Sequence, residues 1–302
     1  MSAKPDLALL RFLCAAAGAT IVLNEAPDGA GAHGSPRAPG NSLPERLVAA
    51  ARALHAAASA DEGATIAYGR LAALPAYAHL RAITAELAAF EPAALGHRAA
   101  RLAFWINVYN VLAIDAAAQF GIAGSVRGQP GFFHRAAYRI GARRFSLHEI
   151  EHGVLRGNRA ALPRLPAPFA PNDARLACCL RPPEPRLHFA LHCATRSCPP
   201  LRVYTAAHVD AELEEATRAF VQGGGVTFAG ETVRLSSIFA FYAEDFGGRT
   251  GLTTVIGPFL EGDERRRLHE ALCAGREQYD PYDWTLNAAG ARVTPLAGTS
   301  AG

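Results

Sequence analysis

The chain has 302 residues, of which half are hydrophobic and 19% are charged, and its formal net charge is +3. This length and balance are typical of a globular protein with a substantial core, organised as one or two domains. The basic residues are spread along the chain without a long basic run, so nucleic acid is not expected as a partner. Six cysteines are too few to form a dense disulfide framework at this length.

The N-terminal part contains an apolar segment of ambiguous meaning. Residues 7–23 are mainly apolar, but Arg11 interrupts them and the preceding residues form only a weak n-region, so no stable membrane span is expected. Residues 24–43 are rich in Gly, Ala, Pro, Ser and Asn, which is typical of a linker. We therefore expect a soluble protein, with the cytoplasm favoured over export. The predicted organisation is an N-terminal segment and flexible linker (1–43), one globular domain (44–288) and a disordered tail (289–302).

Helical patterns dominate the predicted domain. In chain order they cover residues 44–58, 74–89, 98–120, 146–156, 210–222, 236–244 and 263–276. Ser42 and Pro44 signal the start of the first helix, and the capping box Ser146-Leu147-His148-Glu149 signals the start of the fourth. Residues 98–120 are apolar on most faces, which predicts a helix in the core.

Strand signals are short and few. Residues 128–144 predict a loop followed by a short strand or hairpin, and residues 226–233 predict a hairpin around Gly230-Glu231. Residues 158–185 are rich in Pro and Arg and are expected to be irregular, whereas residues 186–193 fit either a buried strand or a short helix. The expected fold class is α+β, with a helix-rich single domain and a few short strand pairs.

The densest group of reactive side chains lies between His188 and Cys198, where two thiols, two imidazoles and two hydroxyls occur within eleven residues. Thiolates and imidazoles serve nucleophilic catalysis and metal ligation. Two prolines follow Cys198, which places this thiol on a loop, whereas Cys193 follows an apolar run. Three interpretations stay open: a catalytic thiol, a metal or redox site, and two packed thiols without chemistry. Cys193 and Cys198 can also pair in an oxidising compartment, but their distance is not encoded in the spacing.

Several motifs resemble, in the same order, those of the family called domain of unknown function 547. These are AFWINVYN at 103–110, IEHGVLR at 150–156, HFALHCATRSCPPL at 188–201, LSSIF at 235–239, DFG at 245–247 and YDWTLN at 282–287. The resemblance is to bacterial members and extends over residues 44–288. It implies no activity, because the family is named for its unknown function.

One motif has the spacing of a zinc site. His148-Glu149-Ile150-Glu151-His152 reads His-Glu-x-x-His, which on a helix places both imidazoles on one face. We do not favour a metal here, because the family usually has an acidic residue at the position of His148 and because the capping box already uses Glu149. Glu151 and His152 match the family segment and are candidate site residues; the alternative is an exposed helix face.

Asn107 and Asn110 lie three residues apart on one face of the most apolar helix. A buried amide needs partners for up to four hydrogen bonds. We therefore expect these side chains either to hold the backbone of neighbouring loops, which we favour, or to line a polar pocket.

The working hypothesis is a cysteine-dependent hydrolase or acyl transferase that acts on a small molecule or peptide and uses no cofactor. Cys198 is the expected nucleophile, with His188 or His152 as its base and Glu151 or Asn107 orienting the imidazole. The expected substrate-binding residues are Asn107, Asn110, Cys193 and Ser197. The alternatives are a non-catalytic ligand- or protein-binding module and a zinc or thiol site. Residues 107–110, 151–152 and 188–198 are predicted to converge on one cleft, with Cys198 the more reactive thiol.

Overall fold

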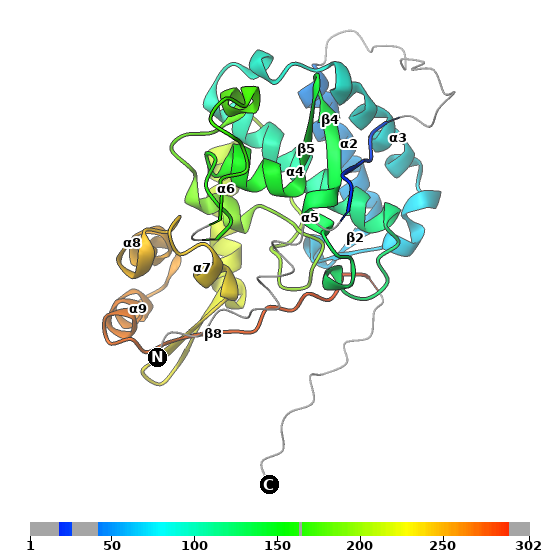
Figure 1. The fold of residues 1–302 in the computed structure, drawn as a ribbon. Helices are drawn as coiled ribbons and strands as arrows, with labels where there is room; N and C mark the ends of the chain where they lie inside the picture. Colours follow the sequence, from blue (N-terminus) through cyan, green and yellow to red (C-terminus); the bar gives the residue numbers. More distant parts are fainter. Residues whose placement is uncertain (1–17, 26–41, 163–164, 290–302) are drawn as a thin grey trace.

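The computed structural model describes residues 18–25, 42–162 and 165–289. Its α-helices are α2 (Leu43–Ala58), α3 (Pro75–Ala85), α4 (Arg98–Gln119), α5 (Phe132–Arg135), α6 (Val209–Phe220), α7 (Ser237–Phe241), α8 (Gly248–Ile256) and α9 (Glu264–Cys273). Its strands are β1 (Ile21–Val22), β2 (Ser59–Ala60), β3 (Thr65–Ile66), β4 (Ala136–Ile140), β5 (Arg143–Ser146), β6 (Val226–Ala229), β7 (Thr232–Leu235) and β8 (Glu277–Tyr279). The predicted helix-rich α+β class is confirmed (Figure 1).

Within the described residues, the strands form three small sheets. In the first sheet, β4 and β5 form an antiparallel hairpin and β1 joins β4 in parallel. In another, β6 and β7 form the predicted hairpin and β8 lies parallel to β7. The third contains only β2 and β3. Gly141 turns the first hairpin with a φ of +58°, a conformation that glycine adopts without strain.

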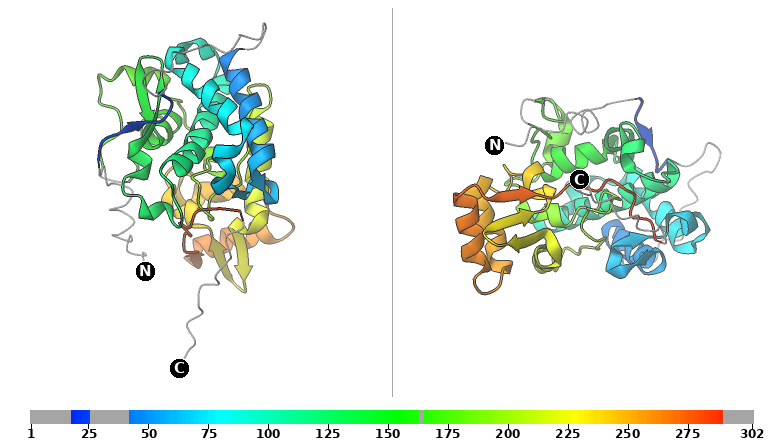
Figure 2. Two further views of the ribbon diagram at one scale, coloured as in Figure 1. Left: turned by 90° about the vertical axis from the view of Figure 1, so that its right-hand side faces the viewer. Right: turned by 90° about the horizontal axis from the view of Figure 1, so that it is seen from below.

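The longest helix, α4, lies in the core as its composition predicts. Its residues from Leu102 to Ala117 are all buried. Helices α2 and α3 pack side by side next to it, as the blue and cyan ribbons of Figure 2 show. At the start of α2, the backbone N–H of Ser42 donates to the Glu45 carboxylate, which completes the cap that the sequence indicates there.

Buried side chains gather in two hydrophobic clusters. The first cluster is built around α2, α3, α4 and the β4–β5 hairpin, with Trp105 and Phe145 among its members. The second cluster is built from β6, β7, α7, α8 and α9, with Phe239 and Phe246 among its members. The chain connects the two twice, because the segment after β8 runs back to the first part (Figure 1). There Leu286 joins the first cluster and forms a β-bridge with Thr195.

Several local features differ from the sequence-based expectations. The helix predicted over 146–156 is a π-helix over Glu149–Leu155, and residues 186–193 are a short 3-10 helix, Pro185–Phe189, followed by a loop. Helix α8 and strand β8 have no counterpart among the predicted elements. Most of the predicted linker and tail, residues 26–41 and 290–302, and residues 1–17 lie outside the described residues.

Residues 18–25 belong to the predicted N-terminal segment and linker, residues 1–43. Here β1 pairs with β4, and the buried Asn24 side chain bonds the backbone of both Thr84 and Arg139. In the three described ranges, no helix has both the length and the apolar character needed to cross a bilayer.

Candidate functional site

A cavity of about 1080 Å³ is lined by residues from both hydrophobic clusters. This volume is slightly above the usual range of small-molecule binding sites. Its apolar lining includes Phe133, Leu162, Leu191, Ile238, Phe241 and Trp284. Its polar lining includes Tyr109, Arg127, His148, Glu151, His152, Arg156, Arg159, His188, Tyr242 and Tyr282, together with Cys193 and Cys198. Such a surface fits an organic ligand with several polar groups.

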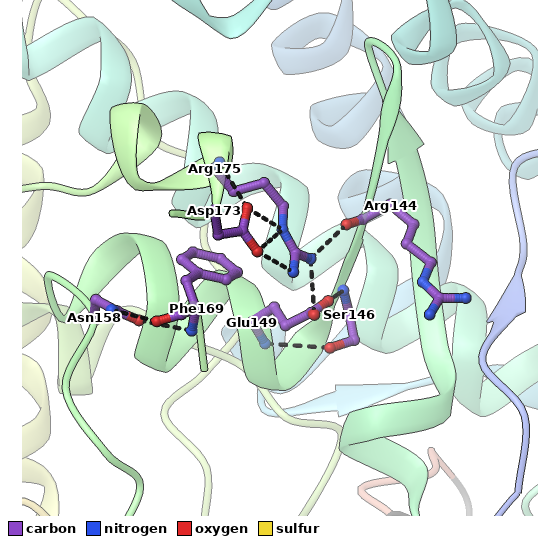
Figure 3. Close-up of polar contacts among 7 residues, drawn as sticks. All are labelled: Arg144, Ser146, Glu149, Asn158, Phe169, Asp173 and Arg175. Atoms are coloured by element: carbon purple, nitrogen blue, oxygen red, sulfur yellow. Dashed lines mark hydrogen bonds and ion pairs between the residues drawn. The ribbon is translucent and has the colours of Figure 1, made fainter. Parts of the chain in front are cut away.

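The π-helix Glu149–Leu155 brings two of the predicted residues to this cavity. Its start is the predicted capping box, in which the Ser146 N–H donates to Glu149 Oε2 at 2.9 Å and the Glu149 N–H donates to Ser146 Oγ at 3.2 Å. Arg175 donates to the other Glu149 oxygen at 2.8 Å (Figure 3). Further along, the Arg156 N–H donates to the Glu151 carbonyl, five residues back. Such wide turns are frequent at functional sites.

Close packing holds the π-helix in place. A Cβ atom on Gly153 would lie 2.5 Å from the Phe169 ring, so only glycine allows this ring to approach. The Asn158 amide fixes the Phe169 backbone by one donated and one accepted hydrogen bond, and the Arg175 guanidinium lies over the ring (Figure 3). The close approach of the Phe169 ring therefore explains why the Ile-Glu-His-Gly segment has glycine at position 153.

Glu151 is a buried carboxylate held by two tyrosines. Tyr109 donates its hydroxyl to Oε2 at 2.9 Å, and Tyr242 donates to Oε1 at 2.5 Å. Burial, and then the nearby Glu151, raise the pKa of both tyrosines well above the usual value, so both hydroxyls stay protonated and act as donors. The alternative of an exposed helix face is wrong, since both Glu151 and His152 are buried.

Asp245 is the centre of a buried charge network. Its carboxylate accepts hydrogen bonds from Arg156 Nε at 2.5 Å, from Arg159 Nη1 at 2.6 Å and from His188 Nε2 at 2.8 Å. Burial alone would raise the pKa of Asp245, but the bonds from His188 and Arg156 outweigh it and lower that pKa below its usual value. Asp245 is therefore ionised at neutral pH.

His188 has only one nitrogen engaged. A carboxylate only accepts, so His188 Nε2 carries the proton that it donates to Asp245. The ring stacks on Tyr242 with centroids 3.7 Å apart. Burial lowers the pKa of His188, and the bond to Asp245 only partly opposes this, so the ring is neutral near pH 7. Among the residues that the structure describes, none forms a hydrogen bond with His188 Nδ1. This nitrogen therefore keeps a lone pair available.

His152 has the complementary arrangement. Its Nδ1 lies 2.7 Å from Arg156 Nη1, and since a guanidinium only donates, Nδ1 is the acceptor and Nε2 carries the proton. Burial, followed by the Arg156 charge, lowers the pKa of His152 well below its usual value. Nε2 lies 3.7 Å from a Glu151 oxygen. His152 is thus a neutral hydrogen-bond donor rather than a free base.

The two cysteines of the predicted cluster form a disulfide. Cys193 and Cys198 are joined, with their Cα atoms 6.1 Å apart, and both contribute to the cavity wall. In this state Cys198 has no thiolate, and none of the described imidazoles forms a hydrogen bond with its sulfur. The prediction of Cys198 as nucleophile with His188 or His152 as base is therefore corrected for the oxidised protein, because its sulfur is already bonded.

Three predicted substrate-binding residues instead hold the backbone in place. Asn110 donates to the Ala190 carbonyl at 3.0 Å and accepts from the His192 N–H at 2.8 Å. Asn107 makes the same pair of bonds with the backbone of Tyr204, and Ser197 Oγ accepts from the Asp283 N–H. The two asparagines thus hold the backbone of neighbouring loops, which is the alternative that the sequence analysis favours. Neither they nor Ser197 belong to the cavity lining, so we no longer place them in substrate binding.

His192 holds the loop that contains the two cysteines in place by hydrogen bonds. Its Nδ1–H donates to the Pro199 carbonyl at 2.8 Å, and its Nε2 accepts from Asn287 at 3.1 Å. Both nitrogens are used and the ring is buried, so His192 does not act together with His188. The predicted convergence on one cleft is thus confirmed for Glu151, His152, His188 and the two cysteines, but not for the asparagines.

In the His-Glu-x-x-His segment, Glu149 is already engaged in structural contacts. Both oxygens of Glu149 are taken, one by the Ser146 backbone and the other by Arg175. Within the described part of the chain, no group of three or more His, Cys, Asp or Glu side chains is arranged to hold a metal ion. His148 stacks between His134 and His152, and burial followed by these neighbours lowers its pKa to about 2.

The sequence-based interpretation missed Tyr109, Tyr242, Asp245 and Tyr282. Tyr109, Asp245 and Tyr282 lie inside motifs that carry the family resemblance, but nothing in a linear motif indicates which side chains meet. Asp245 lies 57 residues from His188, and only the tertiary fold brings the two together. The available signal was the position of the ionisable Asp245 next to the apolar Phe246, because an ionisable residue that is buried needs a partner.

Together these features define a helix-rich α+β protein with a buried acid–base network on a large cavity. Residues 93–221 match the family model described as "Protein of unknown function, DUF547", so this part of the chain is a DUF547 family domain. No curated protein and no solved structure matches the chain. The matched range includes Glu151, His152 and His188, whereas Asp245 and Tyr282 come from residues that follow it.

The buried histidines make folding sensitive to acid. Burial is the main cause that lowers the pKa of His148 to about 2 and of His192 to about 4, and it also lowers those of His152 and His188. Below about pH 6.5 the unfolded chain binds protons that the folded chain does not, so stability falls as the pH falls. Each such histidine contributes up to about 1.4 kcal/mol per pH unit.

We therefore expect urea unfolding to show a marked loss of stability between pH 7 and pH 5. His148→Gln removes one of these protonation sites and makes the dependence shallower, whereas His79→Gln, on the exposed face of α3, is the matched change away from the cavity. An equal slope in wild type and His148→Gln would contradict the assignment.

Removal of one tether gives a second stability prediction. Asn110→Ala leaves the buried carbonyl of Ala190 and the N–H of His192 without their partner. Each unsatisfied group costs about 1–3 kcal/mol, so the free energy of unfolding should fall by about 2 kcal/mol or more. Denaturant titration measures this, with the exposed Gln222→Ala as a reference for loss of an amide outside the core. A change below about 0.5 kcal/mol would show that the tether is not needed.

Proposed function

We propose that the protein is an enzyme that performs general acid–base chemistry on a small molecule or peptide held in the cavity. The observation that supports this most strongly is the buried Asp245–His188 pair, in which His188 lines the cavity and Asp245 holds its ring from behind. An ionised carboxylate that fixes one imidazole nitrogen leaves the other as a base, which is the arrangement used in catalytic triads. The reaction class that fits is hydrolysis, with a water molecule as the nucleophile.

Each group has a role in this proposal. His188 Nδ1 takes a proton from the attacking water, and Asp245 stabilises the imidazolium that forms. His152 Nε2–H is a donor available to the negative charge that develops on the substrate. Glu151 orients the hydroxyls of Tyr109 and Tyr242, which lie on the polar side of the cavity. The proton then returns from His188 to the leaving group, which completes the cycle.

The cysteine-dependent hydrolase or acyl transferase is a second candidate, restricted to the reduced protein. What favours it is that Cys198 and His188 line the same cavity. Reduction would free a Cys198 thiolate there, and that thiolate would replace water as the nucleophile. The two candidates differ in their response to a reductant: the first works with the disulfide intact, and the second does not.

We also propose that the family relationship extends over residues 44–288, as in bacterial-type members, and not only over the matched range. Support comes from the site itself, since Tyr242 and Tyr282 follow the matched residues and yet line the same cavity, and Asp245, which also follows them, holds His188. A DUF547 domain that ended at residue 221 would lack the carboxylate that orients His188.

The experiment that tests the enzyme proposal is a panel of small esters, thioesters and peptide amides, assayed with and without dithiothreitol. We expect turnover of at least one class by the oxidised protein and its loss in His188→Gln. If compounds bind, seen as a raised melting temperature, but none is turned over, the protein is a non-catalytic binding module. Turnover only after reduction would favour the thiol mechanism instead.

A further inference from the structure

We propose that the Cys193–Cys198 disulfide is redox-active and exchanges with small thiols that enter the cavity. This activity goes beyond the acid–base function and does not depend on it. The disulfide is half-buried, and both cysteines belong to the wall of a cavity large enough for a thiol of the size of glutathione. Access is the first requirement for exchange, and the structure meets it.

The second requirement is a good leaving group, and the surroundings of the two sulfurs differ. Cys198 Sγ accepts from the backbone N–H of Cys193 at 3.0 Å, and this donor serves Cys198 alone. The hydroxyls of Tyr282 and Thr195 lie within 3.3 Å of both sulfurs and are shared between them. Neither disulfide sulfur carries a hydrogen, so the hydroxyl is the donor wherever it bonds a sulfur, and Thr195 Oγ1 also donates to the Tyr282 hydroxyl at 3.0 Å. Cys198 therefore becomes the better-stabilised thiolate on reduction.

The third requirement is that both thiols stay close after the bond opens. The loop between them is tied to the returning C-terminal segment without help from the disulfide. Arg196 N–H donates to the Thr285 carbonyl at 2.9 Å, and Asn287 N–H donates to the Ala194 carbonyl at 3.1 Å. The two cysteines are separated by only five positions in sequence, so the effect of the disulfide on the unfolded chain is at the low end for a disulfide. A structural purpose for it is correspondingly weak.

The exchange balances in two steps. An external thiolate attacks Cys193 Sγ, the bond to Cys198 breaks, and Cys198 leaves with the electron pair as a thiolate. A second external thiolate attacks the external sulfur of the mixed disulfide, which releases Cys193 as a thiolate. Two external thiols are thereby oxidised to one disulfide, and the protein pair is reduced by two electrons. The reverse sequence reoxidises the protein at the expense of a small disulfide.

The test is a titration of the folded protein in glutathione redox buffers, followed by alkylation and peptide mapping of every cysteine. We expect one reversible two-electron transition confined to Cys193 and Cys198, with unchanged circular dichroism. In the reduced protein, Cys198 should be alkylated before Cys193. A disulfide that opens only when the chain unfolds, or equal alkylation of both thiols, would overturn the proposal.

Removal of a donor makes the test specific. Tyr282→Phe should raise the apparent pKa of the Cys198 thiol in the pH dependence of alkylation and slow its labelling at pH 7 by roughly threefold, because a smaller thiolate fraction is partly offset by higher nucleophilicity. Thr195→Val is a second variant with the same expected direction. His188→Gln leaves these donors in place and should not alter the redox transition, which separates this proposal from the acid–base one. An unchanged alkylation profile in both donor variants would contradict the leaving-group assignment.

Discussion

Asp245→Asn is expected to lower the free energy of unfolding by about 3–5 kcal/mol. The carboxylate is buried and neutralises two arginines, of which Arg156 has a side chain only 3% exposed. An amide of the same shape keeps some hydrogen bonds but leaves the guanidinium of Arg156 without its hydrogen-bonded counter-charge in a poorly solvated site. Removing one partner of a buried pair costs far more than the pair itself contributes, since the other charge stays behind. Urea unfolding at pH 7 measures the loss.

A matched control is available at the surface. Glu231→Gln also removes a carboxylate that is paired with an arginine, but the side chain of Glu231 is 80% exposed. Solvent screens such a pair, and we expect a change below about 1 kcal/mol. The double variant Asp245→Asn, Arg156→Met removes both buried charges and should be more stable than Asp245→Asn alone. If Asp245→Asn unfolds like wild type, the charge network is not buried as described.

His188→Gln is expected to lower kcat by about 10²–10⁴-fold on any substrate that the wild type turns over, with KM changed only a few-fold. The imidazole is proposed to act on a proton in the transition state and not to anchor the substrate. Glutamine can still donate to Asp245 but has no basic nitrogen. His79→Gln, an exposed change of the same kind on α3, should keep full activity.

The pH dependence of the activity is expected to follow the protonation of His188. The base works only as the neutral ring, and burial lowers the pKa of His188 below its usual value. Activity of the wild type should therefore persist below pH 6.5 and fall on the acid side, as His188 becomes protonated. Any activity left in His188→Gln should lack this acid limb. Full activity in His188→Gln would remove His188 from the mechanism.

Much of the secondary structure was predictable from local signals. The caps at Ser42 and Ser146 start helical segments where their spacing indicates, and the uniformly apolar residues of α4 are buried as their pattern predicts. Both hairpins also follow from local patterns. The π-helix could not be predicted in this way. An apolar pattern of a few residues does not show whether each backbone N–H bonds the carbonyl four residues back, as in an α-helix, or five residues back, as in a π-helix.

The site was predictable only in its parts. Glu151, His152 and His188 were identified as candidates and do line one cavity. Their protonation states depend on Arg156 and Asp245, which the tertiary fold supplies. The state of Cys198 depended on its distance from Cys193, which a spacing of five residues does not fix. Residue types thus indicated the chemistry, whereas the roles came from which nitrogen, oxygen or sulfur meets which donor.

The most direct test is the protonation state of His188 in the folded protein, measured by ¹⁵N NMR of histidine side chains across pH 5–8. His188→Gln identifies the signal by its absence. At pH 7 we expect a neutral ring with the proton on Nε2, held by Asp245, and an unprotonated Nδ1. A doubly protonated ring at pH 7, or a neutral ring with the proton on Nδ1, would contradict the proposal that His188 is a base ready to accept a proton.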